Sequence, residues 1–164
     1  MSLPEQVALA KRMFPRKKGH ARWNLCISHA KRKTLNKICY DAEAKGERLI
    51  VRLADELVNE VFIGCKLVGN TTTKGIVNGV FYEVKSFTEN HVQVKDLESD
   101  EELNVHTDHM RYMRLGWAMC YFTVQGRTLK AHTRLWDTDH KNYTVCILAM
   151  SVGRVCKPTD LDIA

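Results

Sequence analysis

The sequence has no apolar run of the length that crosses a membrane, and residues 1–14 lack the continuous apolar core of a secretion signal. It also has no Cys-x-x-Cys pair, since its cysteines lie far apart, at positions 26, 39, 65, 120, 146 and 156. Most of them have apolar neighbours, which favours buried free thiols in a reducing compartment over disulfides or zinc ligands. We therefore expect a soluble intracellular protein, nuclear or cytoplasmic, with no membrane partner and no metal site.

Several catalytic motifs are missing as well. The sequence contains no G-x-x-x-x-G-K-[ST] and no G-x-G-x-x-G, so it cannot cradle a nucleotide by itself in either familiar way. It contains no G-x-S-x-G and no H-E-x-x-H. The acidic run 96–102 has the wrong spacing for a calcium loop and is typical of a solvated hairpin tip. Asp137, Asp139 and His140 could bind a metal, but a polar loop after a strand is the favoured interpretation.

Positive charge is present in excess and is unevenly placed. The 164 residues carry a formal net charge of +6, and residues 11–33 contain no Asp or Glu. The basic residues of that segment are Lys11, Arg12, Arg16, Lys17, Lys18, Arg22, Lys31, Arg32 and Lys33. Such a patch favours a polyanion such as nucleic acid, and Lys31, Arg32 and Lys33 are candidates for phosphate contacts. The alternative interpretation of this patch is a solvated, partly disordered basic arm. Residues 1–22 are expected to form a basic N-terminal arm.

The hydrophobic pattern before residue 62 predicts helices around one strand. A short helix over 4–14 should end at Pro15, and a basic loop follows. Residues 23–27 read as a buried strand, and Ser28 is a plausible N-cap for a helix that runs to about residue 44. Its expected apolar stripe is Leu35, Ile38, Cys39 and Ala42, and a second helix over 48–61 would bury Leu49, Leu53, Leu57 and Val61.

From residue 62 the period changes. Short alternating strands with tight turns follow one another until about residue 105, which suggests a small antiparallel barrel. Afterwards an apolar strand runs into a Gln125-Gly126 turn and a helix, followed by a strand at 132–136, a helix at 144–155 and a strand at 161–163. The sequence therefore predicts an α/β fold with a parallel sheet, interrupted by a β module.

The segment 115–129 (LGWAMCYFTVQGRTL) resembles motif V of superfamily 1 DNA helicases, in the RecD-like branch that moves 5′ to 3′. The family pattern is roughly L-A-Y-A-M-T-I-H-K-S-Q-G-Q-T-L. A gapless placement matches Leu115, Ala118, Met119, Gln125, Gly126, Thr128 and Leu129, with Trp117 at the aromatic position.

Three further segments resemble the same family, in the right order. Residues 150–155 (MSVGRV) are similar to motif VI and place Arg154 at its arginine. Residues 25–36 are similar to motif IV, where a strand precedes a helix that carries Leu35-Asn36. Residues 64–79 are similar to the segment that leads into a small SH3-like insert. Together the likeness covers about residues 23–163, with an unrelated α/β domain as the alternative.

The resemblance implies a RecA-like parallel sheet with helices on both faces, formed by residues 23–61 and 111–164, and an SH3-like β insert at 62–110. It implies the C-terminal portion of an ATP-dependent DNA helicase that couples ATP hydrolysis to translocation on single-stranded DNA. ATP and Mg2+ would be held mainly by an N-terminal RecA-like helicase domain that is missing from this chain. The chain alone is therefore expected to be inactive. A non-catalytic nucleic-acid-binding domain is the alternative, and a structural interaction domain is a third class.

The family also implies roles for individual residues. Arg154 would be an arginine finger, and Gln125 and Gly126 would face ATP. Thr123, Thr128 and Phe122 would contact DNA, while Trp117 is favoured for the core over base stacking. A surface arginine and a plain turn are the alternatives at Arg154 and Gln125-Gly126. The sequence departs from the family at Phe122-Thr123-Val124, where His-Lys-Ser is usual, and at Gly153, where Ser is usual. These departures suggest a divergent member, viral or degenerate.

Overall fold

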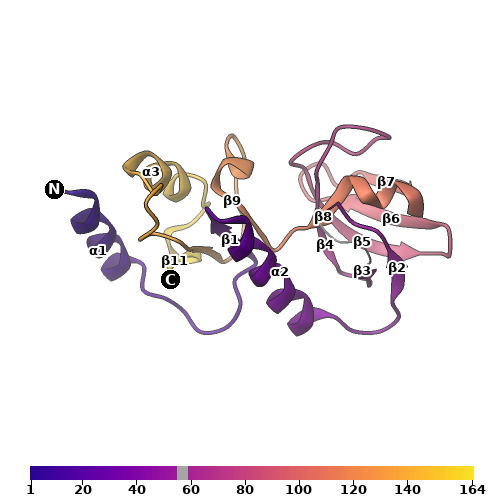
Figure 1. Ribbon diagram of the computed structural model, residues 1–164, viewed down its shortest axis with the longest axis horizontal. Coiled ribbons are helices and arrows are strands. Elements are labelled where there is room, and N and C mark those ends of the chain that lie inside the picture. The colour runs from indigo at the N-terminus through magenta and orange to yellow at the C-terminus, as the bar shows by residue number, and fades with distance from the viewer. Residues whose placement is uncertain (55–58) are drawn as a thin grey trace. The chain divides into compact units, whose positions relative to one another are not determined.

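The computed structural model describes residues 1–54 and 59–164, which form two compact units (Figure 1). The first unit joins the two ends of the chain, Met1–Lys37 and Trp117–Ala164, and is called the sheet unit below. The second unit is continuous, Ile38–Gly116, and is called the β unit. The bounds expected from the sequence, an insert at 62–110, stay a prediction. No helix of the described residues is long and apolar enough to span a membrane.

The sheet unit is built on four parallel strands in the order β11-β10-β1-β9. Their bounds are β1 Trp23–Cys26, β9 Ala118–Cys120, β10 Thr133–Leu135 and β11 Leu161–Ile163. Every residue of β1, β10 and β11 is buried, which is the pattern of parallel strands covered on both faces. The predicted α/β fold with a parallel sheet and an antiparallel β insert is confirmed.

Three α-helices accompany this sheet: α1 Leu3–Met13, α2 His29–Glu43 and α3 Val145–Val152. The predicted start of α2 is confirmed, because Ser28 Oγ accepts a hydrogen bond of 3.0 Å from Lys31 N. The predicted stripe of α2 is only half right. Leu35 and Cys39 are buried, but Ile38 is 45% exposed, and Arg32 and Asn36 are buried instead.

The predicted helix over residues 48–61 is wrong. Leu49–Val51 forms strand β2 and Asn59–Val61 forms strand β3, and the two strands pair in antiparallel fashion with Leu49 opposite Val61. A spacing of four residues fits one face of a helix, but it also fits one face of a strand, whose side chains alternate with period two. Leu57, one of the four predicted helix positions, lies outside the described residues.

The β unit contains a five-stranded antiparallel sheet in the order β7-β6-β5-β4-β8. Its strands are β4 Lys66–Gly69, β5 Phe81–Phe87, β6 His91–Asp96, β7 Glu102–His106 and β8 Met113–Leu115, with the 3-10 helix η1 at Thr107–Tyr112. Val84, Val92 and Val94 are fully buried on its inner face. The predicted succession of short strands is confirmed, whereas a specific likeness to SH3 domains stays a prediction.

The apolar segment that begins at Leu115 is divided between two sheets. Leu115 ends β8 in the β unit, and β9 begins at Ala118 in the sheet unit. Gly116 lies at the break, and its N–H donates to Lys66 O over 2.8 Å. A Cβ atom at Gly116 would lie 2.7 Å from the carbonyl carbon of Leu67. Only glycine allows this close approach of two backbones.

The N-terminal segment is fixed to the sheet by a buried ion pair. Arg134 on β10 donates from Nε and Nη2 to the carboxylate of Asp162 on β11, over 2.7 and 2.8 Å. The same guanidinium donates to the backbone carbonyls of Lys17 and Gly19, and Lys17 N donates to Asp162 Oδ2. His132 Nε2 lies 2.7 Å from Asp162 Oδ2. The basic loop after α1 is therefore bound rather than a loose arm.

Removing one partner of this ion pair should be costly. Burial alone would raise the pKa of Asp162, but hydrogen bonds from Arg134, Lys17 and His132 outweigh it and lower the pKa below its ordinary value. This stabilisation is present above the ordinary aspartate pKa of about 3.9 and is lost as the pH falls through the lower folded value. Asp162→Asn leaves Arg134 buried without its counter-charge, so we expect a loss of about 3–5 kcal/mol.

Urea unfolding at pH 7 and at pH 3 measures both effects. The exposed Asp139→Asn is the matched control and should stay within about 0.5 kcal/mol of the parent protein. The difference in the free energy of unfolding between Asp162→Asn and the parent protein should be smaller at pH 3 than at pH 7. Equal stability of Asp162→Asn and Asp139→Asn at pH 7 would contradict the role of the ion pair.

Candidate nucleic-acid interface

The segment that resembles motif V forms a short strand, a 3-10 helix and a glycine turn. β9 ends at Cys120 and the 3-10 helix η2 follows at Tyr121–Val124. Gly126 has a φ of +79° with open space around it, so glycine is suited here by its backbone conformation rather than by crowding. Tyr121 is 1% exposed, and its hydroxyl donates to Trp136 O over 2.5 Å, which ties η2 to the end of β10.

The helix predicted after the Gln125-Gly126 turn is wrong. Residues 127–132 have no helical structure, and Leu129 instead forms a parallel bridge with Val155. Leu129 N donates to Arg154 O over 2.7 Å, and Cys156 N donates to Leu129 O over 3.1 Å. These two hydrogen bonds pair the backbone N–H and C=O groups of Leu129, so neither group needs a helix as its partner. They also bring the two segments that resemble motifs V and VI side by side.

Arg154 follows the end of α3 directly at this junction. Its side chain is half-buried, and among the described residues its Nε atom is shielded from solvent without a hydrogen-bond partner. A buried guanidinium nitrogen normally has an acceptor, so this Nε atom is a polar group that the described part of the unit leaves unsatisfied. The phosphate-facing role that the family resemblance implies for Arg154 stays a prediction.

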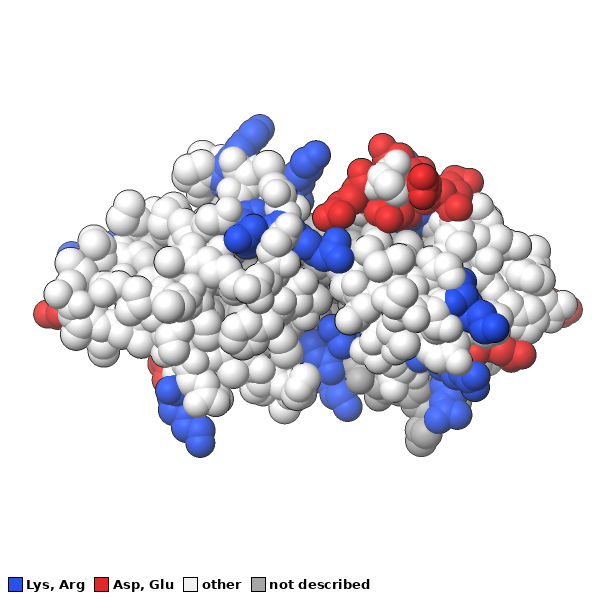
Figure 2. Space-filling view, turned by 90° about the horizontal axis from the view of Figure 1, so that it is seen from above, with Lys and Arg blue, Asp and Glu red and all other residues white. Residues whose placement is uncertain are grey.

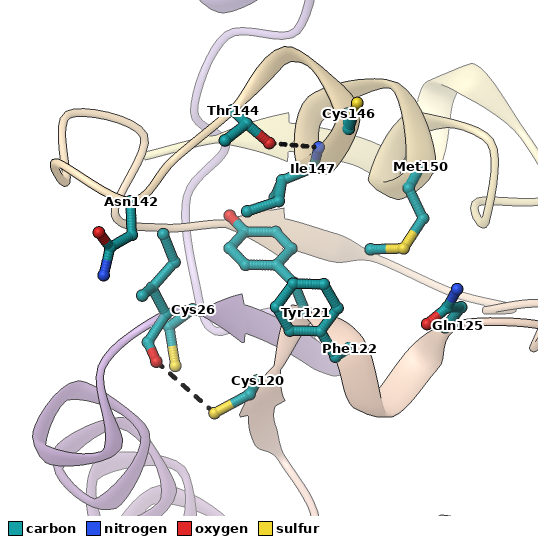
Figure 3. Close-up of a pocket in the computed structure, with 11 residues that line it drawn as sticks. Cys26, Cys120, Tyr121, Phe122, Gln125, Asn142, Thr144, Cys146, Ile147 and Met150 are labelled. Atoms are coloured by element: carbon teal, nitrogen blue, oxygen red, sulfur yellow. Dashed lines mark hydrogen bonds between the residues drawn. The ribbon is translucent and has the colours of Figure 1, made fainter.

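A pocket of about 570 Å³ lies between α3 and the carboxyl ends of β1 and β9 (Figure 3). Phe122 is 70% exposed at this pocket, although most large apolar side chains of the unit are buried. The structure brings Phe122 and Gln125 together here, two residues for which the sequence predicts DNA and ATP contacts. The wall formed by α3 includes Ile147 and Met150, and the carboxyl ends of the strands contribute Cys26 and Cys120.

Asn36 on α2 fixes the point at which the chain returns to the sheet. Its Oδ1 accepts from Trp117 N and Ala118 N over 3.0 and 2.8 Å, and its Nδ2 donates to Ala118 O over 3.0 Å. Asn24 on β1 completes the clamp, since its backbone N donates to Trp117 O over 2.8 Å. Trp117 is fully buried, which confirms its place in the core. Sequence reasoning named Asn36 only through the family resemblance.

The basic residues of α2 lie in different surroundings. Lys31 Nζ lies 5.0 Å from the ring centre of Trp136, a ring that Arg16 also approaches to 5.0 Å. Lys33 is exposed, whereas Arg32 is only 4% exposed. Lys31 and Lys33 can therefore reach a phosphate from the surface, and the predicted phosphate contact of Arg32 would need a ligand close to the helix itself.

Two structural features near β10 were missed by sequence reasoning. Asp137 has a φ of +60°, and its carboxylate accepts from Ile27 N and Ser28 N over 2.9 and 3.2 Å, which orders the turn between β1 and α2. Trp136 donates from Nε1 to Asn24 Oδ1 over 3.0 Å. The sequence showed an acid at the end of a strand but gave no sign of its partner. No group of three or more His, Cys, Asp or Glu in the described part of the chain could hold a metal ion.

The two units differ in the sign of their charge. The residues of the sheet unit include 16 Lys and Arg against 5 Asp and Glu, a formal net charge of +11. The residues of the β unit include 9 Lys and Arg against 14 Asp and Glu, a formal net charge of −5. On the face drawn in Figure 2, the largest group of acidic side chains forms one dense patch, and smaller acidic groups lie elsewhere, some beside basic side chains. A polyanion is therefore attracted to the sheet unit and repelled by the β unit.

No family model and no curated protein sequence matches this chain. Its fold is similar to solved Pif1 helicases. A structure of two coordinating Pif1 helicases at forked double-stranded DNA is 14% identical with a TM-score of 0.70, and the match covers 97% of this chain and 42% of the other. Bacteroides Pif1 bound to single-stranded DNA is 13% identical with a TM-score of 0.67, covering 98% and 45%.

Pif1 helicase from Candida albicans is 11% identical with a TM-score of 0.67, and the match covers 97% of this chain and 49% of the other. At this level of identity the likeness establishes the fold alone. The chain spans less than half the length of these three structures.

The Asn36 clamp predicts a large loss of stability on mutation. Asn36→Leu keeps the approximate shape but leaves two buried N–H groups and one carbonyl without their partner, so we expect a loss of at least about 2 kcal/mol. Thr34→Val, at an exposed position of the same helix, is the control and should cost far less. Thermal unfolding followed by circular dichroism gives the comparison. A melting temperature of Asn36→Leu equal to that of Thr34→Val would show that the clamp does not matter.

Proposed function

We propose that this chain is the C-terminal, RecA-like portion of an ATP-dependent DNA helicase of the RecD-like branch. The observation that carries the proposal is the +11 charge of a parallel-sheet unit whose fold is similar to that of Pif1 helicases. The four motif resemblances, in the order of the family, support it. The departures at Phe122-Thr123-Val124 and Gly153 favour a divergent member, viral or degenerate.

Single-stranded DNA would run over the sheet unit. Phosphates would be bound by Lys31 and Lys33, with Arg32 and the hydroxyls of Thr123 and Thr128 as further donors. Phe122 would stack on a base, since its ring is exposed at the pocket. In the family a cation occupies the position of Thr123, so the grip on the backbone would depend more on α2 here.

ATP and Mg2+ would be held mainly by an N-terminal RecA-like domain, because this chain has neither phosphate-binding loop. Arg154 would place its guanidinium against the γ-phosphate and stabilise the charge that develops there. Gln125 and Gly126 would face the same bound nucleotide. The backbone bonds between Leu129 and the 154–156 segment would link the nucleotide-facing and DNA-facing parts of the unit.

DNA binding by the isolated chain is the first test. Fluorescence anisotropy with a labelled single strand should show weak binding at low salt, with a log–log salt slope of about −0.7 for each phosphate neutralised. Lys33→Glu should weaken binding and make that slope less negative. Lys45→Glu, at an exposed position of the β unit, should change the affinity and the slope little. No binding at low salt, or an equal effect of the two variants, would contradict DNA binding by the sheet unit.

The alternative is a non-catalytic nucleic-acid-binding domain, such as a degenerate helicase remnant. The chain alone should hydrolyse no ATP under either proposal. When it is joined to an N-terminal domain with a phosphate-binding loop, Arg154→Ala should lower ATP turnover by about 10³-fold and leave DNA affinity unchanged if the chain belongs to a helicase. Lys157→Ala, an exposed cation close by, is the control. Unchanged turnover in Arg154→Ala would favour the binding domain.

A further inference from the structure

The pocket at the carboxyl ends of β1 and β9 has an apolar interior that is held in place by the fold (Figure 3). Tyr121 lines it and is only 1% exposed. Its hydroxyl donates to Trp136 O, and its ring meets that of Tyr143 edge-on with the ring centres 5.6 Å apart. Ile147 and Met150 add apolar surface from α3. The pocket is therefore formed before any ligand arrives.

The lining of the pocket is uncharged, although the sheet unit carries a net charge of +11. None of the described residues that line it is Asp, Glu, Lys, Arg or His. Burial raises the pKa of the Cys26 thiol to about 12, so this side chain also stays neutral at pH 7. A phosphate would find no cation inside. The pocket is suited instead to a neutral group that belongs to a molecule whose anionic part is attracted to the rest of the unit.

The burial predicted for the cysteines is confirmed only in part. Cys26, Cys39 and Cys65 are buried and Cys120 is half-buried, whereas Cys146 and Cys156 are exposed.

Most polar groups of the pocket already have partners within the unit. The hydroxyl of Thr144 accepts a hydrogen bond from the backbone of α3, and the thiols of Cys26 and Cys120 donate to backbone carbonyls. The side chains of Gln125 and Asn142 are exposed, and neither amide group hydrogen-bonds to any of the residues that the structure describes. Figure 3 shows these two amides on opposite sides of the pocket. They are the groups left to recognise a ligand.

An aromatic ring beside a side-chain amide matches the chemistry of a nucleobase. Phe122 is 70% exposed at the pocket, and exposed aromatic rings stack on the faces of unpaired bases. A side-chain amide carries a donor next to an acceptor, and the polar edge of adenine offers the complementary pair. A base is also a neutral ring on an anionic backbone, which fits an uncharged pocket in a strongly basic unit.

We propose that this pocket takes up one unstacked base of a bound single strand, with Asn142 hydrogen-bonded to the polar edge of the base. The face of the base lies against Phe122, and its edge is directed toward Asn142. Gln125 is not needed for this contact and keeps the nucleotide-facing role proposed above. Base uptake rests on the proposed function, because only a strand bound to the sheet unit presents its bases here. It extends that function from stacking at the surface to recognition of a base edge.

Strands that carry a single base test this uptake, because only that base can occupy the pocket. One strand is an abasic sugar–phosphate backbone of about ten residues, and two others carry one central adenine or one central indole. Fluorescence anisotropy at low salt should show that the adenine strand binds about 5-fold or more tightly than the abasic strand. It should also bind about 5-fold more tightly than the indole strand, since indole has a similar shape but no polar edge.

Two variants separate the edge of the base from its face. Asn142→Ala should bind the adenine and indole strands equally and keep most of the gain over the abasic strand. Phe122→Ala should lose most of that gain for both bases. Each ratio is taken against the affinity of the same variant for the abasic strand. Asn104→Ala, which removes an exposed amide from β7 of the β unit, is the control and should leave every ratio unchanged. Circular dichroism checks that each variant is folded.

The three strands also distinguish failure of base uptake from failure of DNA binding. Equal affinities for the adenine and abasic strands would overturn base uptake and leave phosphate binding by the sheet unit intact. An unchanged ratio of adenine to indole affinity in folded Asn142→Ala would overturn the role of Asn142. Absence of binding to all three strands would contradict the proposed function and base uptake together.

Discussion

The amide of Asn36 is the contact on which the sheet unit depends most. The chain leaves this unit within α2 and returns only at Trp117, so the whole β unit separates β9 from β1 along the chain. Three hydrogen bonds from one side chain to Trp117 and Ala118 fix that return point, and Asn24 binds the same turn from β1. The buried amide thus sets the register in which β9 joins β1.

This register places the chemistry of the unit at one edge of the sheet. Because β1 and β9 are parallel, their carboxyl ends meet, and there they present the pocket, Phe122 and the two thiols. After η2 and the Gly126 turn, Leu129 forms a bridge with Val155. This bridge holds Arg154 beside the segment that follows η2. In open α/β sheets, ligands bind at the carboxyl ends of the strands. The proposed DNA and phosphate contacts follow from this placement, together with the +11 charge of the unit.

The spacing of apolar residues predicted the elements that are set by the local sequence. It failed where one spacing fits both a helix and a strand. The buried run 23–27, the stop at Pro15 and the cap at Ser28 have local causes, and all three were predicted. The spacing of four at 48–61 fits a strand as well as a helix, so the antiparallel pair of β2 and β3 was missed. The buried face of α2 could not be predicted from its apolar residues alone. Asn36 is buried because it hydrogen-bonds to backbone groups about 80 residues away in the sequence. The ion pair of Arg134 and Asp162 is equally non-local, and the site roles rested on family resemblance.

Photocrosslinking tests the proposed DNA interface of the sheet unit most directly. A single strand containing 5-iodouracil, bound at low salt and irradiated, would mark the side chains that stack on its bases, and mass spectrometry would identify them. The proposed interface predicts crosslinks at Phe122 that disappear at high salt and in Phe122→Ala. Crosslinks confined to residues 38–116, with none in the sheet unit, would contradict it.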